Sequence, residues 1–341
     1  MPHSVPPWLT GTALPWLSEE ASVFGQGPLI VADAADARPL EECCAELQSA
    51  ILVGVDEAGA LPQSAEIFDV LLTTAPSPPR PWVQVQSIAE TLAALAAAIK
   101  ANPNAATILI QVLRAQRGLS FEAALMIESF AYSALLGGAE FRRWRTASPP
   151  HVHPHPQEDG PAVRSEREAE TMRITLARPK SGNATTAELR DELVEALRIA
   201  RLDDTIRSVE IRGEGRVFSQ GGALGEFGTA EDLALAHHLR TVRSAALALH
   251  RLKAHSRVIV QGAAVGGGIE FAAAATEVIA RPSAFFMLPE LAMGLIPGAG
   301  GTVTVARRIG WQRMAYMTLS GMRLRARTAL AWGLVDRLED D

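Results

Sequence analysis

The fold of this chain is decided by the stretch GAAVGGGIE, residues 262–270, which follows the short β-branched run RVIV at 257–260. Such a run bounded by glycine predicts a buried strand. Three consecutive glycines then open a segment of helix-forming residues that reaches Ala275, so the backbone can turn sharply there. A helix that begins at these glycines leaves its first N–H groups free and directs the positive end of its dipole to the same place. The stretch therefore predicts a strand, a tight turn and a helix N-terminus that favours an oxyanion or a phosphate.

Two glutamates accompany this stretch. Glu270 falls in the first turn of the predicted helix, and Glu290 follows after short strands predicted at 277–280 and 284–287. The run GLIPGAGGT then occupies 294–302. Taken singly, a triple glycine more often reflects close packing, and an acid in a first helical turn is favoured by the helix dipole alone. The conjunction of a glycine turn, two glutamates and a second glycine-rich run favours a catalytic site.

In order and spacing, these features resemble the crotonase family, the enoyl-CoA hydratases and isomerases. The likeness rests on residues 262–270, on FMLPE at 286–290 and on the run at 294–302, and it extends more loosely from about Thr171 to Asp336. It implies an α/β protein whose second half forms a crotonase-like ββα spiral. Within that half we expect a strand at 171–176, an amphipathic helix at 186–200 and another helix at 233–252.

The resemblance also locates the second half of an oxyanion hole, where the family carries phenylalanine, two or three small residues, glycine, alanine and aspartate. Here FSQGGA occupies 218–223, so Gly222 stands in place of the alanine and Ala223 in place of the aspartate. We therefore expect the backbone N–H groups of Gly222 and Gly267 to hold a thioester oxygen. The residues expected to contact the substrate are Gly221, Ala223, Gly266 and Gly298. Taken alone, the two glycines at 221–222 are typical of an ordinary turn between strand and helix.

The expected chemistry follows from this arrangement. Two N–H groups that converge on a thioester oxygen stabilise the negative charge that develops there in the transition state. Glu270 and Glu290 can then supply the acid and the base that add water, because two carboxyl groups in one small site have their pKa values pushed apart. The sequence does not say which glutamate is the acid and which the base.

The resemblance thus implies an enoyl-CoA hydratase, a hydro-lyase that needs no cofactor because coenzyme A is part of its substrate. An isomerase or a hydrolase of the same family is one alternative. A non-catalytic acyl-CoA-binding or assembly subunit is the other. The resemblance further implies a homo-oligomer, a trimer or a dimer of trimers, in fatty acid or aromatic acid metabolism.

Composition sets the outer limits. With 341 residues, 48% hydrophobic, and a net charge of -6, the chain can bury one large or two modest domains and is not expected to bind nucleic acid. It shows neither a membrane-spanning apolar run nor a signal-peptide pattern, so we expect a soluble, cytoplasmic protein. The adjacent Cys43 and Cys44 are expected to be thiols on a helix rather than a disulfide or a metal site.

A segment rich in proline and histidine, SPPHVHPHPQEDGP at 148–161, divides the chain. Its prolines interrupt helices and central strands. Its histidines at 151, 153 and 155 lie in an extended stretch without a preorganised site, so we expect a linker and no metal. We assign 1–147 to an N-terminal α/β and helical region, 148–168 to the linker and 169–341 to the crotonase-like core.

The N-terminal region shows a helical pattern at 87–144. Crotonases continue beyond the equivalent of Asp336 with helices that cover the acyl site, whereas this sequence ends at Asp341. Because 87–144 weakly resembles those helices, we expect it to replace that cover. Ahead of it, strands predicted at 29–31, 50–53 and 68–72 surround a helix predicted at 39–47. That part is either a vestigial crotonase spiral or an unrelated α/β domain.

Overall fold

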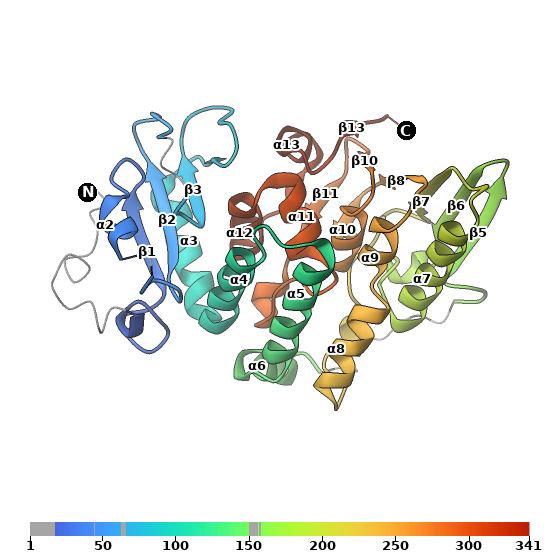
Figure 1. The fold of residues 1–341 in the computed structure, drawn as a ribbon, viewed down its shortest axis with the longest axis horizontal. Coiled ribbons are helices and arrows are strands. Elements are labelled where there is room, and N and C mark those ends of the chain that lie inside the picture. Colours follow the sequence, from blue (N-terminus) through green and yellow to red (C-terminus); the bar gives the residue numbers. More distant parts are fainter. Residues whose placement is uncertain (1–17, 44, 63–65, 150–155, 157, 341) are drawn as a thin grey trace.

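The structure is a computed structural model that describes residues 18–43, 45–62, 66–149, 156 and 158–340. The N-terminal sheet and the largest sheet lie toward opposite ends of an elongated molecule, with helices between them (Figure 1). The N-terminal elements are β1 (Leu29–Asp33), α2 (Arg38–Glu42), β2 (Ile51–Asp56), β3 (Val70–Thr73), β4 (Val83–Gln84), α3 (Ile88–Ala101), α4 (Pro103–Ala115), α5 (Phe121–Leu136) and α6 (Ala139–Ala147).

The second half of the chain supplies the other elements. They are β5 (Val163–Glu168), β6 (Thr171–Leu176), η3 (Pro179–Ser181), α7 (Ala187–Leu202), β7 (Ser208–Gly213), η4 (Leu224–Glu226), α8 (Leu233–Val242), α9 (Ala245–His250), β8 (His255–Val260), β9 (Ala263–Val265), α10 (Gly267–Ala272), β10 (Glu277–Ala280), β11 (Phe285–Met287), η5 (Glu290–Met293), α11 (Gly301–Ile309), α12 (Trp311–Ser320), β12 (Leu324–Arg325), α13 (Ala326–Trp332) and β13 (Arg337–Leu338).

The N-terminal strands form one parallel sheet in the order β1-β2-β3-β4. Strand β2 is buried along its whole length, as expected of a parallel strand covered on both faces. The strands predicted at 29–31, 50–53 and 68–72 are thus confirmed. The helix predicted at 39–47 is shorter and ends at Glu42, with Cys43 buried beside it, while Cys44 lies outside the described residues. The relation of this sheet to a crotonase spiral stays a prediction.

The second half contains a six-stranded sheet, β13-β10-β8-β7-β6-β5, and a three-stranded sheet, β12-β11-β9. Strand β8 leads directly to β9 and then to α10, and β10 leads directly to β11. Successive strands therefore alternate between the two sheets before a helix follows, which is the ββα arrangement expected. The α/β fold class is confirmed.

Two predictions in this half are wrong. The last six residues assigned to the linker form strand β5, which pairs antiparallel with β6. Its sequence VRSERE has almost no apolar side chains, because it is an edge strand exposed at all but Val163. The helix predicted at 233–252 is two helices, because Ser244 caps α9 by accepting a hydrogen bond from the N–H of Leu247. The histidines at 151, 153 and 155 lie outside the described residues.

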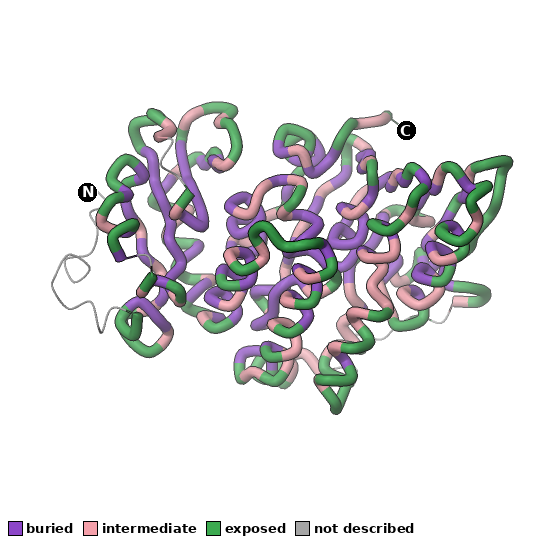
Figure 2. Tube along the Cα trace, in the orientation of Figure 1, coloured by how far each residue is buried: buried purple, intermediate pink, exposed green. Residues whose placement is uncertain are grey.

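Helices α3 to α6 pack on the second half, as expected of a helical cover. Helices α3 and α4 contact α12, α5 lies against α8 and α11, and α6 contacts η5. Asn102 between α3 and α4 donates a 2.8 Å hydrogen bond to the carbonyl of Leu291 in η5. One hydrophobic core runs from β2 to the last helix, and Figure 2 shows this buried interior through the middle of the molecule. Within the described part of the chain, no single helix is long and apolar enough to span a membrane; only α3 and α4 together, bent by 105°, meet that criterion of length and composition.

Candidate active site

The predicted turn before α10 positions both glutamates. Gly266 adopts φ 45° and ψ -125°, a conformation that glycine accommodates and that residues with a Cβ rarely adopt. A Cβ on Gly266 would lie 2.5 Å from Oε1 of Glu290 and 4.0 Å from Oε1 of Glu270. The absence of a side chain here therefore leaves room for two carboxyl groups near one backbone turn.

The carboxyl group of Glu270 is held by the second glycine-rich run. Its Oε2 accepts hydrogen bonds from the N–H groups of Ala299 at 2.7 Å and Gly301 at 2.9 Å. A Cβ on Gly301 would lie 2.7 Å from Cγ of Glu270, so glycine permits this close approach. Burial raises the pKa of Glu270 to about 7, although the N–H groups around it favour the carboxylate and oppose that rise.

The carboxyl group of Glu290 has a different environment. Glu290 begins η5, which follows β11 after Leu288 and Pro289, and its Oε2 is buried without a hydrogen-bond partner among the described residues. Burial raises the pKa of Glu290 well above its usual value, and the negative charge of Glu270 adds to this rise. Glu290 therefore retains its proton more readily than Glu270 does.

The backbone N–H groups of Gly222 and Gly267 lie beside Glu270 and Glu290. The Cβ that Gly267 lacks would be 3.8 Å from the backbone N of Gly222, so the two residues are close neighbours. Within the described ranges, neither N–H donates a hydrogen bond to another protein group. Bonds from Thr185 N to the carbonyl of Gly221 (2.7 Å) and from Ala223 N to the carbonyl of Thr185 (3.2 Å) hold the loop in place.

The structure also explains why Gly222 replaces an alanine. A Cβ at this residue would lie 2.5 Å from Cε1 of Phe227, whose ring fills that space. Gly221 has φ 89°, and a Cβ on it would lie 2.6 Å from the carbonyl oxygen of Val265. Both glycines are therefore required by close packing around the loop.

Two cavities meet at these groups. The smaller, of about 510 Å³, contains Gly222, Gly267, Glu270 and Glu290 in its wall, and the larger has about 770 Å³. The residues that line both cavities are Thr185, Arg190, Arg240, Gly267, Gly298 and Ala299. Of the four residues predicted to contact substrate, Ala223 and Gly298 line the smaller cavity, whereas Gly221 and Gly266 are not among the described residues that line either cavity. The roles of all these residues stay predictions.

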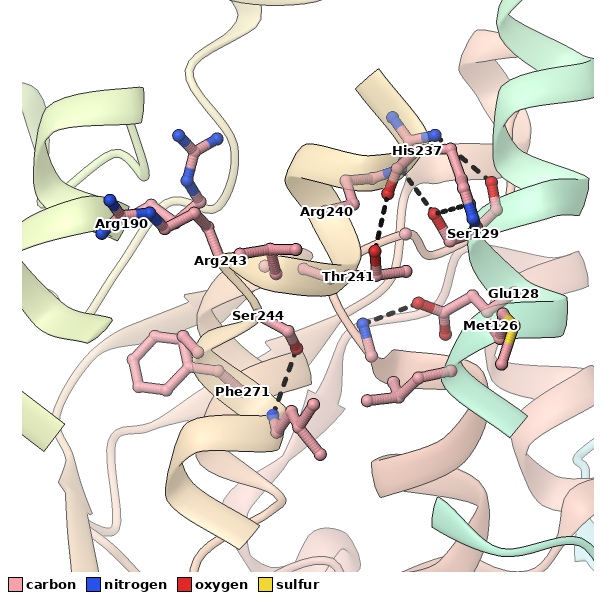
Figure 3. A pocket seen from close by; sticks show the side chains of 18 of the residues that line it. Met126, Glu128, Ser129, Arg190, His237, Arg240, Thr241, Arg243, Ser244 and Phe271 are labelled. Atoms are coloured by element: carbon pink, nitrogen blue, oxygen red, sulfur yellow. Dashed lines mark hydrogen bonds between the residues drawn. The ribbon is translucent and has the colours of Figure 1, made fainter. Parts of the chain in front are cut away.

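The two cavities differ in charge. The larger carries arginines and histidines, and its Arg190 and Arg243 point into the same space (Figure 3). Arg243 forms no ion pair with any described residue, whereas Arg251 is paired with Glu122 at 3.1 Å. Acidic side chains predominate in the smaller cavity, where the basic residues are Arg190 and Arg240 and the acidic ones are Glu226, Glu231, Asp232, Glu270 and Glu290.

Sequence reasoning missed three polar side chains at this site. Glu128 and Tyr132 come from α5 in the N-terminal half, and a Cβ on Gly298 would lie 2.3 Å from Cδ2 of Tyr132. Thr185 lies beside Gly267, with Oγ1 buried and without a partner among the described residues. The available signal was a glutamate within the apolar run FEAALMIESFAYSALL of α5. Nowhere in the described chain do three or more His, Cys, Asp or Glu side chains cluster as a metal site would require.

Comparisons with known proteins locate the likeness in the second half. A family model described as "Enoyl-CoA hydratase/isomerase" matches residues 166–339. "Probable enoyl-CoA hydratase" of Rhodobacter capsulatus is 39% identical over 48% of this chain and 62% of that protein. "1,2-epoxyphenylacetyl-CoA isomerase" of Escherichia coli is 33% identical over 52% of this chain and 70% of that protein. The crystal structure of an enoyl-CoA hydratase from Thermoplasma volcanium superposes with a TM-score of 0.50 at 33% identity, over 53% of this chain and 73% of that one. The chain thus spans less than two thirds of the first of these relatives.

Proposed function

The chain belongs to the enoyl-CoA hydratase/isomerase family, as its sequence predicts, and we propose that it is an enoyl-CoA hydratase. The reaction proposed is the addition of water across the 2,3 double bond of an enoyl-CoA thioester. The observation that carries this proposal is the pair of carboxyl groups of Glu270 and Glu290 near Gly266, beside the neighbouring N–H groups of Gly222 and Gly267, which donate to no described protein group. A site with two carboxyl groups in unlike environments suits a reaction that needs both a base and an acid.

The first step proposed is polarisation of the thioester. The N–H groups of Gly222 and Gly267 donate hydrogen bonds to its carbonyl oxygen, where negative charge develops as water attacks. Because both donors are backbone groups in a packed loop and a helix N-terminus, they need no rearrangement during the reaction. The conjugated double bond then becomes electron-poor at the β carbon.

The two glutamates take opposite roles in this proposal. Glu270 is the base, because two N–H groups donate to its Oε2 and favour the carboxylate. It accepts a proton from the water whose oxygen bonds to the β carbon. Glu290 is the acid: its carboxyl group is buried, and Oε2 has no hydrogen-bond partner among the described residues, so it retains a proton, which it gives to the α carbon. The product is a 3-hydroxyacyl-CoA, and proton exchange with solvent restores both side chains.

The charges of the two cavities support an orientation for the substrate. Coenzyme A carries phosphates, and the larger cavity alone contains Arg243, which forms no ion pair with any described residue. Apolar side chains that line the smaller cavity include Leu136, Leu235 and Leu239, and its acidic residues disfavour phosphate. We therefore place the acyl chain in the smaller cavity and the coenzyme in the larger. Coenzyme A is part of the substrate, so no separate cofactor is proposed.

An isomerase is the second candidate. One relative is named an isomerase, and shifting a double bond needs a proton removed and returned, which a single carboxyl group can do. The pair of buried glutamates favours the hydratase, because water addition uses both. Homo-oligomeric assembly and a cytoplasmic location stay predictions.

The test is the loss of ultraviolet absorbance of short and medium trans-2-enoyl-CoA substrates, measured with the wild type, Glu270→Gln and Glu290→Gln. We expect each variant to lower kcat by about 10²-fold or more, because each removes one proton-transfer group. Glu168→Gln, an exposed change on β5, is the matched control and should keep wild-type turnover. Turnover that needs only one of the two glutamates would favour the isomerase, and no turnover with any enoyl-CoA would contradict both candidates.

A further inference from the structure

Glu128 of α5 is a buried carboxyl group from the N-terminal half at the edge of the proposed active site. Its side chain is 2% exposed and points toward the loop at 299–302. Oε1 accepts a 2.7 Å hydrogen bond from the N–H of Gly300, and Oε2 accepts bonds from the N–H (2.9 Å) and hydroxyl (2.6 Å) of Thr302. Figure 3 shows Glu128 reaching across from α5 to this backbone.

The same loop binds both buried carboxyl groups with alternate amides. The N–H groups of residues 299 and 301 donate to Glu270, and those of residues 300 and 302 donate to Glu128. Four consecutive N–H groups therefore point alternately to the two sides of one short segment. A shift of the loop that lengthens the bonds to Glu128 must also move the donors of Glu270.

We propose that Glu128 is a positioning residue, which fixes the loop at 299–302 and thereby the amides that hold the carboxylate of Glu270. This inference rests on the proposed function, in which Glu270 is the base. It makes the N-terminal half a structural part of the active site, because the loop is held from one side by α10 and from the other by α5. Small displacements of a catalytic group are costly in rate, so fixing the loop matters for turnover.

A second contact from the N-terminal half supports this role. Gln116, at the end of α4, donates a 2.9 Å hydrogen bond to the hydroxyl of Thr302, which in turn donates to Glu128. The hydroxyl thus connects two N-terminal helices to the loop. Such a connected set of side chains fixes one arrangement of the segment.

Charge couples the two carboxyl groups as well. Burial raises the pKa of Glu128 to about 8, and the negative charge of Glu270 contributes to that rise. The other ionisable groups that face Glu128 are Glu290 from η5, Tyr132 from α5 and Arg240 from α8. Because the pKa of Glu128 is the higher of the two, Glu128 is still protonated where Glu270 titrates, so its replacement by a neutral residue removes no charge there. A loop that moves its amides away from Glu270 should instead raise the pKa of Glu270, because those N–H groups favour the carboxylate.

A purely structural role would have a different signature. A carboxylate at the N-terminus of α11 also stabilises the helix through its dipole, which affects folding but not catalysis. Glu140 provides the comparison, because it is 6% exposed and accepts bonds from the N–H groups of Asn104 (2.8 Å) and Ala105 (3.0 Å) at the start of α4. Glu140 performs that helix-capping role away from Glu270.

The experiment compares Glu128→Gln with Glu140→Gln in the full chain. Glutamine supplies one acceptor where Glu128 supplies two, so one loop N–H loses its partner. We expect Glu128→Gln to lower kcat by about tenfold to a hundredfold with little change in KM, and to move the acidic limb of the kcat/KM profile to higher pH, because Glu270 loses amides that favour its carboxylate. Glu140→Gln should lower the melting temperature and leave kcat and the profile unchanged. Thr302→Val removes the hydroxyl that donates to Glu128 and accepts from Gln116 but keeps the backbone N–H bond to Glu128. It should show a smaller loss of kcat and serves if Glu128→Gln does not fold.

A readout independent of turnover separates this inference from the proposed function. Isotope-edited NMR of the glutamate carboxyl groups gives the titration of Glu270, whose signal is assigned by its absence in Glu270→Gln. A higher pKa of Glu270 in Glu128→Gln supports the inference even if the wild type hydrates no enoyl-CoA, whereas a lower pKa contradicts it. Unchanged kcat, pH profile and Glu270 titration in a folded Glu128→Gln protein would overturn it.

Discussion

Replacing Gly267 by alanine should separate catalysis from stability. Gly267 is the first residue of α10, and its missing Cβ would meet nothing closer than Oγ1 of Thr185 at 3.7 Å, Cβ of Ala299 at 3.8 Å and N of Gly222 at 3.8 Å. These are ordinary van der Waals distances, so the folded protein can accept the methyl group. The methyl group would, however, lie beside the amide of Gly222, in the space where we place the thioester oxygen.

The variant is expected to gain stability and to lose activity. Alanine in place of glycine restricts the unfolded chain, so the free energy of unfolding should rise by about 0.4–1 kcal/mol if the backbone is unstrained. Denying the oxygen one donor of an oxyanion hole typically lowers kcat by about 10²–10³-fold. The variant should thus be at least as stable as the wild type and nearly inactive.

Gly268→Ala is the matched control, one residue along the same helix. Its Cβ would lie 2.7 Å from Cβ of Ser219 and 3.2 Å from the carbonyl oxygen of that buried residue, so something must shift. Overpacking of this kind costs about 1–3 kcal/mol in the free energy of unfolding. Urea denaturation and enoyl-CoA turnover measured on both variants provide the test. Wild-type kcat in Gly267→Ala would refute the proposed oxyanion hole.

Three further outcomes are expected. The kcat/KM of the wild type should decrease at pH values below about 7, where Glu270 gains a proton, and should decrease again at high pH, where Glu290 loses one. A kcat/KM that stays constant across neutral pH would contradict these roles. Folding raises the pKa values of Glu128 and Glu270 to about 8 and about 7, so the stability that these groups contribute is complete below their unfolded pKa of about 4.5 and is lost as the pH rises through the folded values. The melting temperature of the wild type should therefore decline over that range more steeply than that of Glu270→Gln. Equal slopes for the two proteins would contradict this contribution of Glu270. Finally, Arg114→Met should lower the free energy of unfolding by about 3–5 kcal/mol in urea denaturation, because it leaves the fully buried Asp69 without its ion-pair partner at 2.5 Å. A loss below about 1 kcal/mol would show that this ion pair does not stabilise the contact between α4 and the N-terminal sheet.

The part of the site that sequence could predict is local. The β-branched run at 257–260, the triple glycine and the helix formers that follow specify strand, turn and helix within a few residues, and the structure has all three. Glu270 lies in the first turn of α10 for the same reason. The backbone amides of Gly222 and Gly267 were located by family spacing, and the structure brings them together.

What sequence could not predict depends on contacts between distant segments. Glu128 is separated from Gly300 by 172 residues, and nothing in the pattern of α5 says which loop it will meet. Strand β5 has hardly any apolar alternation, because it is stabilised by pairing with β6 at an exposed edge. The break between α8 and α9 depends on one capping serine within a sequence that otherwise favours helix. Tertiary context decides each of these features.

The most direct test of the proposed hydratase is the mass of its product. A short trans-2-enoyl-CoA is incubated with the wild-type protein in water labelled with heavy oxygen, and the thioester is analysed by mass spectrometry. Water addition predicts a 3-hydroxyacyl-CoA that is heavier by one labelled water, formed by the wild type and not by Glu270→Gln or Glu290→Gln. A product of unchanged mass, or release of free coenzyme A, would contradict the hydratase and favour an isomerase or a hydrolase.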